Sequence, residues 1–287
     1  MESPGSPRPI VQSGAPRVLR IDSRRRKFPD LAELIEYLPL AFLLGRRDIT
    51  TRYRQTVLGT VWIFAGALVT AGLFSFVFGR VARLPSDGYP YFIFSYTGLL
   101  VWNLYSNVLT SVSGSLNSNG TLISKIYFPR LVLPLSTLAG NLLNLAISFG
   151  IMIVLLFAFG IGITWHMVLL PVWLLLGLML GVGAGLVLAS FSVAYRDIGY
   201  LTPVLTSILL YLSPVAYSIS AVPESLRNVY LLNPIASVIE GCRWSALGRA
   251  YVPPTWAIVY SFAFAVALLL VGLSIFSYRE SHFADVI

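Results

Sequence analysis

Long apolar runs separated by short polar segments dominate the pattern along the chain. Runs long enough to cross about 30 Å of hydrocarbon, which takes roughly 20 helical residues, occur near residues 57–79, 91–112, 131–160, 167–194, 200–221 and 255–277. Helices are the expected spanning form, because lipid offers backbone groups no water and the runs lack the alternation of barrel strands. The pattern predicts an all-α, polytopic membrane protein with six transmembrane helices.

A shorter amphipathic segment precedes the first run. Its apolar positions recur at helical spacing: Leu31, Leu34, Ile35, Leu38 and Phe42. Asp30 followed by Glu33 gives a capping signal. Charge and Pro39 interrupt the segment too often for it to span, so we expect an interfacial helix along the inner leaflet. Four basic residues precede the first apolar run, at its expected cytoplasmic end. We call them the basic collar: Arg46, Arg47, Arg52 and Arg54.

Two connections between runs carry helix signals of their own. The polar and basic stretch 117–130 predicts a short inner helix with exposed apolar residues, which suits the docking of a partner. On the outer side, Pro223 and Glu224 begin one short helix, and Asn233 with Pro234 begins another that runs toward Gly248. Neither outer helix is long enough to cross, so region 222–250 is predicted to be a re-entrant pair.

Composition agrees with lipid as the solvent. Charged residues are 11% and hydrophobic residues 56% of the chain, where soluble proteins carry roughly a quarter charged residues. Residues 1–28 are rich in Pro, Ser and Arg without an apolar block, so we expect a disordered basic tail and no cleavable signal peptide. The basic run 24–27 fits anionic lipid binding and fits a topology signal equally.

The distribution of basic residues predicts the orientation. A cytoplasmic N-terminus places 15 of the 20 Lys and Arg residues inside and 5 outside, which is the bias that the positive-inside rule describes. Both termini are therefore expected in the cytoplasm.

Missing residue types exclude several function classes. The six runs hold no Asp, Glu, Lys, Arg or His, which argues against an ion-coupled carrier. No nucleotide-binding Gly-Lys-Ser or Gly-Lys-Thr exists, because the only lysines are Lys27 and Lys125. Active transport would then need a separate ATPase. Cys242, His166 and His282 lack neighbours at metal-ligand spacing, so we expect no metal site.

Uncharged polar groups and aromatic rings remain as candidates for a substrate path. Ser, Thr and Asn residues in the second and third runs fit helix-to-helix hydrogen bonding about as well as a polar conduit. The C–H faces of sugars stack on aromatic rings, although interfacial belts and core packing also explain such rings. The candidate channel-lining residues are Trp62, Phe74, Tyr91, Phe94, Trp102, Tyr105, Tyr211 and Tyr217.

Several motifs occur in a recognisable order. Segment 47–62 reads RDITTRYRQTVLGTVW, and it is followed by KIYFPR at 125–130, YRD at 195–197, YLSPV at 211–215, VPE at 222–224 and LNP at 232–234. Together they resemble the ABC type-2 permeases that export lipid-linked polysaccharides such as O-antigen, teichoic acid and mycobacterial galactan. The resemblance covers residues 31–287. Ala65-Gly66-Ala67 departs from it, since many relatives carry a kinking proline there.

The resemblance implies a transport subunit of the bacterial cytoplasmic membrane rather than an enzyme. It implies a homodimer with an interfacial channel, two copies of a cytoplasmic ATPase that holds ATP and Mg²⁺, and no cofactor on this chain. The substrate would be carried on polyprenyl pyrophosphate, which Arg46, Arg47, Arg52 and Arg54 could hold bidentately. Residues 31–44 would form a gate helix within the amphipathic and basic region 29–56, and 57–287 the transmembrane domain. The ATPase-coupling residues would be Leu122, Ile123, Ser124, Lys125, Tyr127, Phe128 and Arg130.

Two alternatives stay open at this point. One is an ABC type-2 exporter of another lipid or a drug. The other is a polyprenyl-linked glycosyltransferase or ligase, which would need a catalytic carboxylate or histidine in a large outer loop, where Asp87, Glu224 and Glu240 are the only candidates. Membrane lipids are the other expected contacts, and no nucleic-acid partner is expected.

Overall fold

The computed structural model describes residues 31–53, 61–123, 125–126, 128–162, 164–195, 197–248 and 250–280. These residues form helices and connecting segments without a β-strand, which confirms the all-α prediction for this part of the chain. The helices are α1 (Leu31–Glu36), α2 (Leu38–Tyr53), α3 (Val61–Phe74), the π-helix η1 (Ser75–Val81), α4 (Tyr91–Ser118), α5 (Gly120–Ile123), α6 (Val132–Ala158), the 3₁₀ helix η2 (Trp165–Leu169), α7 (Leu170–Ser192), α8 (Ile198–Leu212), the 3₁₀ helix η3 (Ile219–Ala221), α9 (Glu224–Leu231), α10 (Pro234–Leu247) and α11 (Thr255–Arg279).

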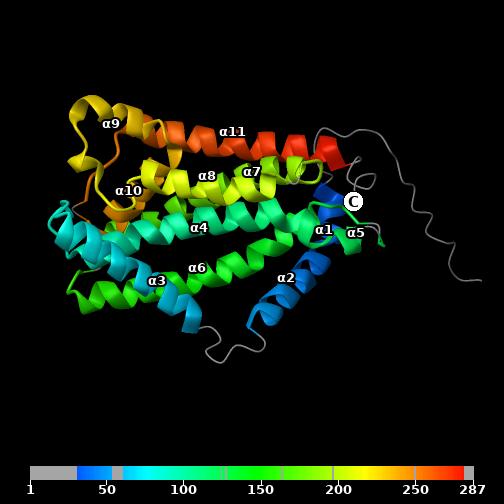
Figure 1. Ribbon diagram of the computed structural model, residues 1–287, viewed down its shortest axis with the longest axis horizontal. Coiled ribbons are helices and arrows are strands. Elements are labelled where there is room, and N and C mark those ends of the chain that lie inside the picture. The colour runs from blue at the N-terminus through cyan, green and yellow to red at the C-terminus, as the bar shows by residue number, and fades with distance from the viewer. Residues whose placement is uncertain are drawn as a thin grey trace, which may run out of the picture.

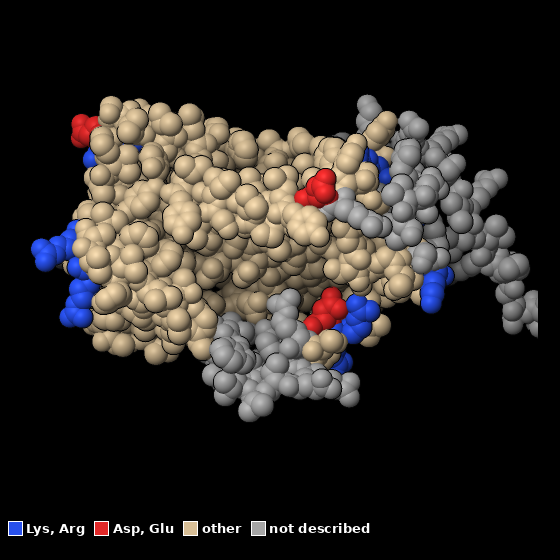
Figure 2. All heavy atoms as spheres, viewed as in Figure 1, with Lys and Arg blue, Asp and Glu red and all other residues tan. Residues whose placement is uncertain are grey.

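The long helices α4, α6, α7, α8 and α11 run along the long axis of the molecule (Figure 1). Helices α9 and α10 lie at one end of this bundle, and α1 and α5 lie at the opposite end. We call these the α10 end and the α5 end. On the face shown in Figure 2, the coloured charges gather toward the two ends and the surface between them is mostly uncharged.

Three helical segments of the described chain are long and apolar enough to cross a membrane: Val132–Ala158, Trp165–Ser192 and Thr255–Arg279. The apolar helices Ala65–Val81 and Ile198–Leu212 are shorter. Helix α4 has the length, with 28 residues, but it carries many hydroxyl and amide side chains. The prediction of a membrane protein therefore holds, and three of the six predicted spans meet both criteria.

Helix α4 forms the centre of the bundle, where it contacts α3, α6, α7, α8 and α10. Helices α7 and α11 approach each other closely at two glycines. A Cβ atom on Gly183 would lie 2.8 Å from Leu269 N, and one on Gly272 would lie 2.6 Å from Gly183 O. Small residues at such contacts let membrane helices pack backbone against backbone. The α7–α11 pair is thus a closely packed unit.

The N-terminal amphipathic segment differs from its prediction in extent. It forms α1 and α2, separated at Tyr37, and α2 continues to Tyr53. Pro39 stands in the first turn of α2, where its missing N–H is tolerated. The basic collar up to Tyr53 is therefore helical. The predicted cap Asp30 lies outside the described residues.

Within the stretch 117–130, where a short inner helix was expected, the structure has the four-residue helix α5. Asn117 and Ser118 complete α4, α5 is a single turn, and Lys125 and Ile126 lie in a turn. Pro129 disfavours a helical residue before it, which accounts for the non-helical conformation of Phe128.

The two outer helices match their predicted boundaries. Helix α9 begins at Glu224, and α10 begins at Pro234 after an Asn233 side chain that accepts a hydrogen bond from the Ile235 amide. Gly248 ends α10 with a φ of 86°, a left-handed conformation that favours glycine. Helix α10 packs against α4, α7 and α11.

Candidate functional site

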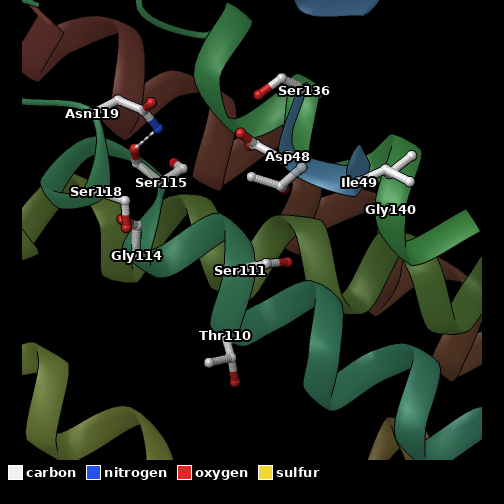
Figure 3. A pocket seen from close by; sticks show the side chains of 11 residues that line it. Asp48, Ile49, Thr110, Ser111, Gly114, Ser115, Ser118, Asn119, Ser136 and Gly140 are labelled. Atoms are coloured by element: carbon white, nitrogen blue, oxygen red, sulfur yellow. Dashed lines mark hydrogen bonds between the residues drawn. The ribbon is translucent and has the colours of Figure 1, made fainter. Parts of the chain in front are cut away.

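A polar cleft opens at the α5 end of the bundle between α2, α4 and α6 (Figure 3). Its volume is about 240 Å³. The lining comprises Asp48 and Ile49 of α2, Thr110, Ser111, Gly114, Ser115 and Ser118 of α4, Asn119 directly after α4, and Ser136, Thr137 and Gly140 of α6. One carboxylate accompanies hydroxyl and amide groups, so the cleft suits a hydroxyl-rich ligand better than an anion.

Local hydrogen bonds keep these side chains in place. The Ser111 and Ser118 hydroxyls donate to carbonyls of their own helix, at 2.7 Å to Asn107 O and 3.0 Å to Gly114 O. Asn141 Nδ2 of α6 donates to Ser111 Oγ of α4 at 2.7 Å and thereby joins the two helices beside the cleft. Hydroxyls that donate to a backbone carbonyl keep lone pairs free to accept from a ligand.

The basic collar lies at the edge of this cleft. Arg47 pairs with Asp48 Oδ1 at 3.0 Å, and its Nη2 donates to Asn119 Oδ1 at 3.1 Å. Arg46 is exposed on the same helix. The Arg52 side chain and Arg54 lie outside what the structure describes. Arg47 thus connects α2 to the residue that ends α4.

The predicted ATPase-coupling residues divide into exposed and buried positions. Lys125 is exposed, and Ile126 is 57% exposed although it is apolar. Ile123 and Phe128 are buried, while Leu122 is half-buried. Ser124 and Tyr127 fall outside the described residues. The described surface of this segment therefore offers one large apolar side chain beside a cation.

The predicted channel-lining aromatics do not share one surface. Tyr211 of α8 is 71% exposed, and half-buried Tyr217 donates its hydroxyl to Tyr211 O at 3.3 Å. Phe74 is half-buried against Phe78. The Trp62 side chain lies outside the described part.

The other predicted lining residues lie inside the protomer. Trp102 and Tyr105 pack together within the core of α4, with 5% and 8% of their surface exposed. Half-buried Tyr91 donates its hydroxyl to Ala216 O. Phe94 is fully buried. A buried ring has no surface to offer a transported chain, so the protomer does not support contact by Phe94, Trp102 or Tyr105.

A buried ion pair at the α10 end was not predicted as such. Arg243 and Glu240 of α10 are fully buried and join at 3.1 Å. The Arg243 guanidinium lies 3.9 Å from the centroid of the Phe94 ring. A Cβ atom on Gly98 would lie 2.5 Å from Arg243 Nη2, so a larger residue at this position would have to displace the guanidinium. The sequence signal was two opposite charges three residues apart in an otherwise apolar helix.

This pair holds the segment that follows α8. Arg243 Nη2 donates to Pro214 O at 3.0 Å and to Val215 O at 3.1 Å. Glu240 Oε1 accepts from the Ile219 amide at 2.9 Å. The backbone turns here because Pro214 cannot continue a helix, and Arg243 supplies donors that its carbonyls would otherwise lack.

Asp87 fastens the same segment from the connection before α4. Its two carboxylate oxygens accept from the hydroxyls of Ser218 and Ser220 at 2.8 Å and 2.7 Å. Asp87, Glu224 and Glu240 had been the outer candidates for a catalytic carboxylate. Glu240 and Asp87 instead hold backbone and hydroxyl groups, and Glu224 is a partner of Arg227 at 3.5 Å. The arrangement is a structural one.

Comparisons with known proteins agree with one another. The family described as ABC-2 type transporter matches residues 39–247. The chain is 31% identical over 255 residues to the O-antigen export system permease protein RfbA of Myxococcus xanthus, covering 88% of this chain and 97% of that protein. A protein of the same name from Klebsiella pneumoniae is 26% identical, covering 86% and 95%. The polysialic acid transport protein KpsM of Escherichia coli is 25% identical, covering 82% and 91%.

Proposed function

The chain belongs to the ABC-2 type transporter family, and we propose on this basis that it is the membrane subunit of an ATP-driven exporter of a lipid-linked polysaccharide. The observation that carries the proposal is the match, over nearly the whole chain, to permeases named for O-antigen export. The chain is a membrane transport subunit and not an enzyme, and an ABC permease of this family works with an ATPase partner.

In the proposed topology the chain crosses the membrane six times. The crossings are α3 with η1, α4, α6, η2 with α7, α8, and α11, which follow one another in alternating directions. The α5 end would face the cytoplasm, and with it both termini, as the positive-inside rule favours. Lys125 follows α5, Arg130 lies just before α6, and Arg279 is the last residue of α11. Helices α9 and α10 then form the re-entrant pair at the outer face.

In the proposed path, two copies of the chain enclose a channel, and substrate enters beside α2. Arg46, Arg47, Arg52 and Arg54 would hold the pyrophosphate of the lipid carrier. The Arg47–Asp48 pair is exposed, at 52% and 42%, and such pairs contribute only about 0–1 kcal/mol. Arg47 can therefore exchange Asp48 for phosphate at little cost. The hydroxyl-lined cleft next to it supplies neutral partners for the first sugars.

The partner ATPase, in two copies, would dock on the 117–130 segment from the cytoplasm. Exposed Ile126 and Lys125 support this placement, because apolar side chains exposed to water at the end of a bundle are typical of interaction sites. ATP and Mg²⁺ would stay on the ATPase.

The proposal is tested in the bacterium that encodes the chain. Removal of the gene is expected to abolish surface display of one polysaccharide and to leave its lipid-linked form inside the cell. Expression of the chain should restore display, and expression with a catalytically inactive ATPase should not. Normal display without the chain would contradict the proposal.

Replacement of Tyr211 by alanine is expected to slow export roughly two- to tenfold while leaving the fold intact. The ring is 71% exposed on α8, so folding loses little, whereas a stacked sugar loses about 0.5–1.5 kcal/mol. The rate of polysaccharide export measures the effect. Tyr200→Ala is the matched control, since Tyr200 is 79% exposed at the opposite end of the same helix. Equal rates in both variants and wild type would remove Tyr211 from the path.

A further inference from the structure

The two ends of the 117–130 segment are hydrogen-bonded to different helices. At its start, Asn119 Oδ1 accepts from Arg47 of α2 at 3.1 Å. At its end, the Arg130 amide donates to Glu280 Oε1 at 2.6 Å, and Arg130 Nη1 donates to Glu280 O at 3.0 Å. Arg130 and Glu280 are 150 residues apart in the chain. We call these two hydrogen bonds, both donated by Arg130 and accepted by Glu280, the Arg130–Glu280 bracket.

Glu280 directly follows α11. The preceding residue, Arg279, connects this end of α11 to α7. Arg279 Nη1 donates to Ser190 O of α7 at 3.4 Å, and its guanidinium lies 4.2 Å from the centroid of the Phe191 ring. Helices α7 and α11 are already packed backbone against backbone at Gly183 and Gly272. A displacement of the 117–130 segment that reaches Glu280 therefore reaches a stiff helix pair.

Between its two ends the segment is partly buried, with Ile123 and Phe128 packed in the core of the bundle. Helix α5 is a single turn that contacts the end of α4, and the turn at Lys125 and Ile126 is exposed. Arg130 and Glu280 are half-buried, and this burial raises the pKa of the Glu280 carboxyl, against the lowering effect of Arg130. Glu33 of α1 is close enough to raise this pKa further. The start of the N-terminal amphipathic region thus lies near the bracket.

We propose that Glu280 is a positioning residue for transport: the Arg130–Glu280 bracket carries movement of the ATPase-docked segment to the α7–α11 pair. This inference rests on the proposed function. Arg130 is one of the predicted coupling residues. Its partner Glu280, at the end of α11, was not predicted from the sequence. Without the bracket, nucleotide hydrolysis by the ATPase still displaces the exposed turn at Lys125 and Ile126, but a smaller part of this displacement reaches α7 and α11.

The test uses the full chain in membrane vesicles with its copurifying ATPase. Glu280→Ala removes the acceptor for the Arg130 amide, so hydrogen exchange at that amide is expected to accelerate about tenfold, the factor that one hydrogen bond to a charged group represents. ATP consumed per polysaccharide exported is expected to rise severalfold. Glu280→Gln keeps an oxygen acceptor and should restore both values toward wild type. Ser274→Ala in α11 should change neither value, because the Ser274 hydroxyl donates back to Leu270 O.

The results distinguish failure of the Arg130–Glu280 bracket, or of its role in transmission, from failure of the proposed exporter function. Unchanged exchange at Arg130 in Glu280→Ala overturns the bracket. Faster exchange with an unchanged ratio of ATP to export overturns its role in transmission and leaves the exporter intact. A purely structural role would lower the amount of folded complex without altering that ratio. Hydrolysis without polysaccharide export by the wild-type complex would contradict the proposed function itself and the inference with it.

Discussion

Replacement of Arg243 by alanine is expected to destabilise the protein by about 3–5 kcal/mol, because it leaves the Glu240 carboxylate buried without its cation. Both side chains are fully buried in the wild type. The change also removes the donors to Pro214 O and Val215 O, so the segment after α8 should loosen. Unfolding of the purified protein in detergent, followed by circular dichroism, measures the loss.

Two further variants make this expectation specific. Arg227→Ala removes another arginine of the α10 end, which donates to Val222 O and Ser220 O and pairs with a Glu224 that is 89% exposed. It should cost less than Arg243→Ala, because it leaves no buried charge without a partner. Glu240→Gln combined with Arg243→Ala removes the buried charge altogether and should recover part of the loss. If Arg243→Ala unfolds like Arg227→Ala, the buried pair does not anchor the segment.

Replacement of Ile126 by aspartate is expected to abolish export by separating the chain from its ATPase. Ile126 is 57% exposed, so the fold should tolerate the change. At the proposed docking surface, a buried carboxylate in place of an apolar anchor should cost at least about 2 kcal/mol, or roughly thirtyfold in affinity. Copurification of the ATPase with the chain measures the effect.

Leu226→Asp is the matched control for this variant. Leu226 is 49% exposed on α9 at the α10 end, away from the proposed docking surface. It should keep ATPase binding at the wild-type level. Retention of the ATPase by Ile126→Asp would show that the partner docks elsewhere.

The helical layout could be predicted from the sequence because local signals agree with the final packing. The cap at Asn233, the proline at 234 and the left-handed Gly248 act within a few residues of α10, so its boundaries follow from local chemistry. The apolar runs at 131–160 and 255–277 correspond to α6 and α11 for the same reason.

The exposure of individual rings could not be predicted, since it depends on which helices pack around them. Phe94 and Trp102 belong to an apolar run that also holds uncharged polar residues, yet α4 lies at the centre of the bundle and buries them. Tyr211 is exposed because α8 packs on the outside of α4 and α7. The sequence shows where the aromatic residues are, but it does not show which helices pack against them.

Long-range polar partners were missed for a similar reason. Glu280 meets Arg130 across 150 residues of chain, and Arg243 meets the carbonyls of a segment nearly 30 residues earlier, as with Pro214, 29 residues away. Both contacts join separate elements, so no local pattern in the sequence predicts them. The charges themselves were visible, in segments otherwise dominated by apolar residues, and unusual charges of this kind mark tertiary contacts to look for.

The links at the α5 end give the proposed exporter a physical basis for coupling. The 117–130 segment is joined to α2 through Arg47 and Asn119, and to α11 through Arg130 and Glu280. The polar cleft lies between the first link and α6. An ATPase that displaces this segment would therefore act on the entrance helix and on the bundle together.

Reconstitution of the purified chain in vesicles, with and without its ATPase, tests the central claim most directly. The measured quantity is the transfer of lipid-linked polysaccharide across the membrane. The account predicts transfer only when the ATPase, Mg²⁺ and hydrolysable ATP are all present on the side of the α5 end. Transfer by the chain alone, driven by a proton or sodium gradient, would contradict it.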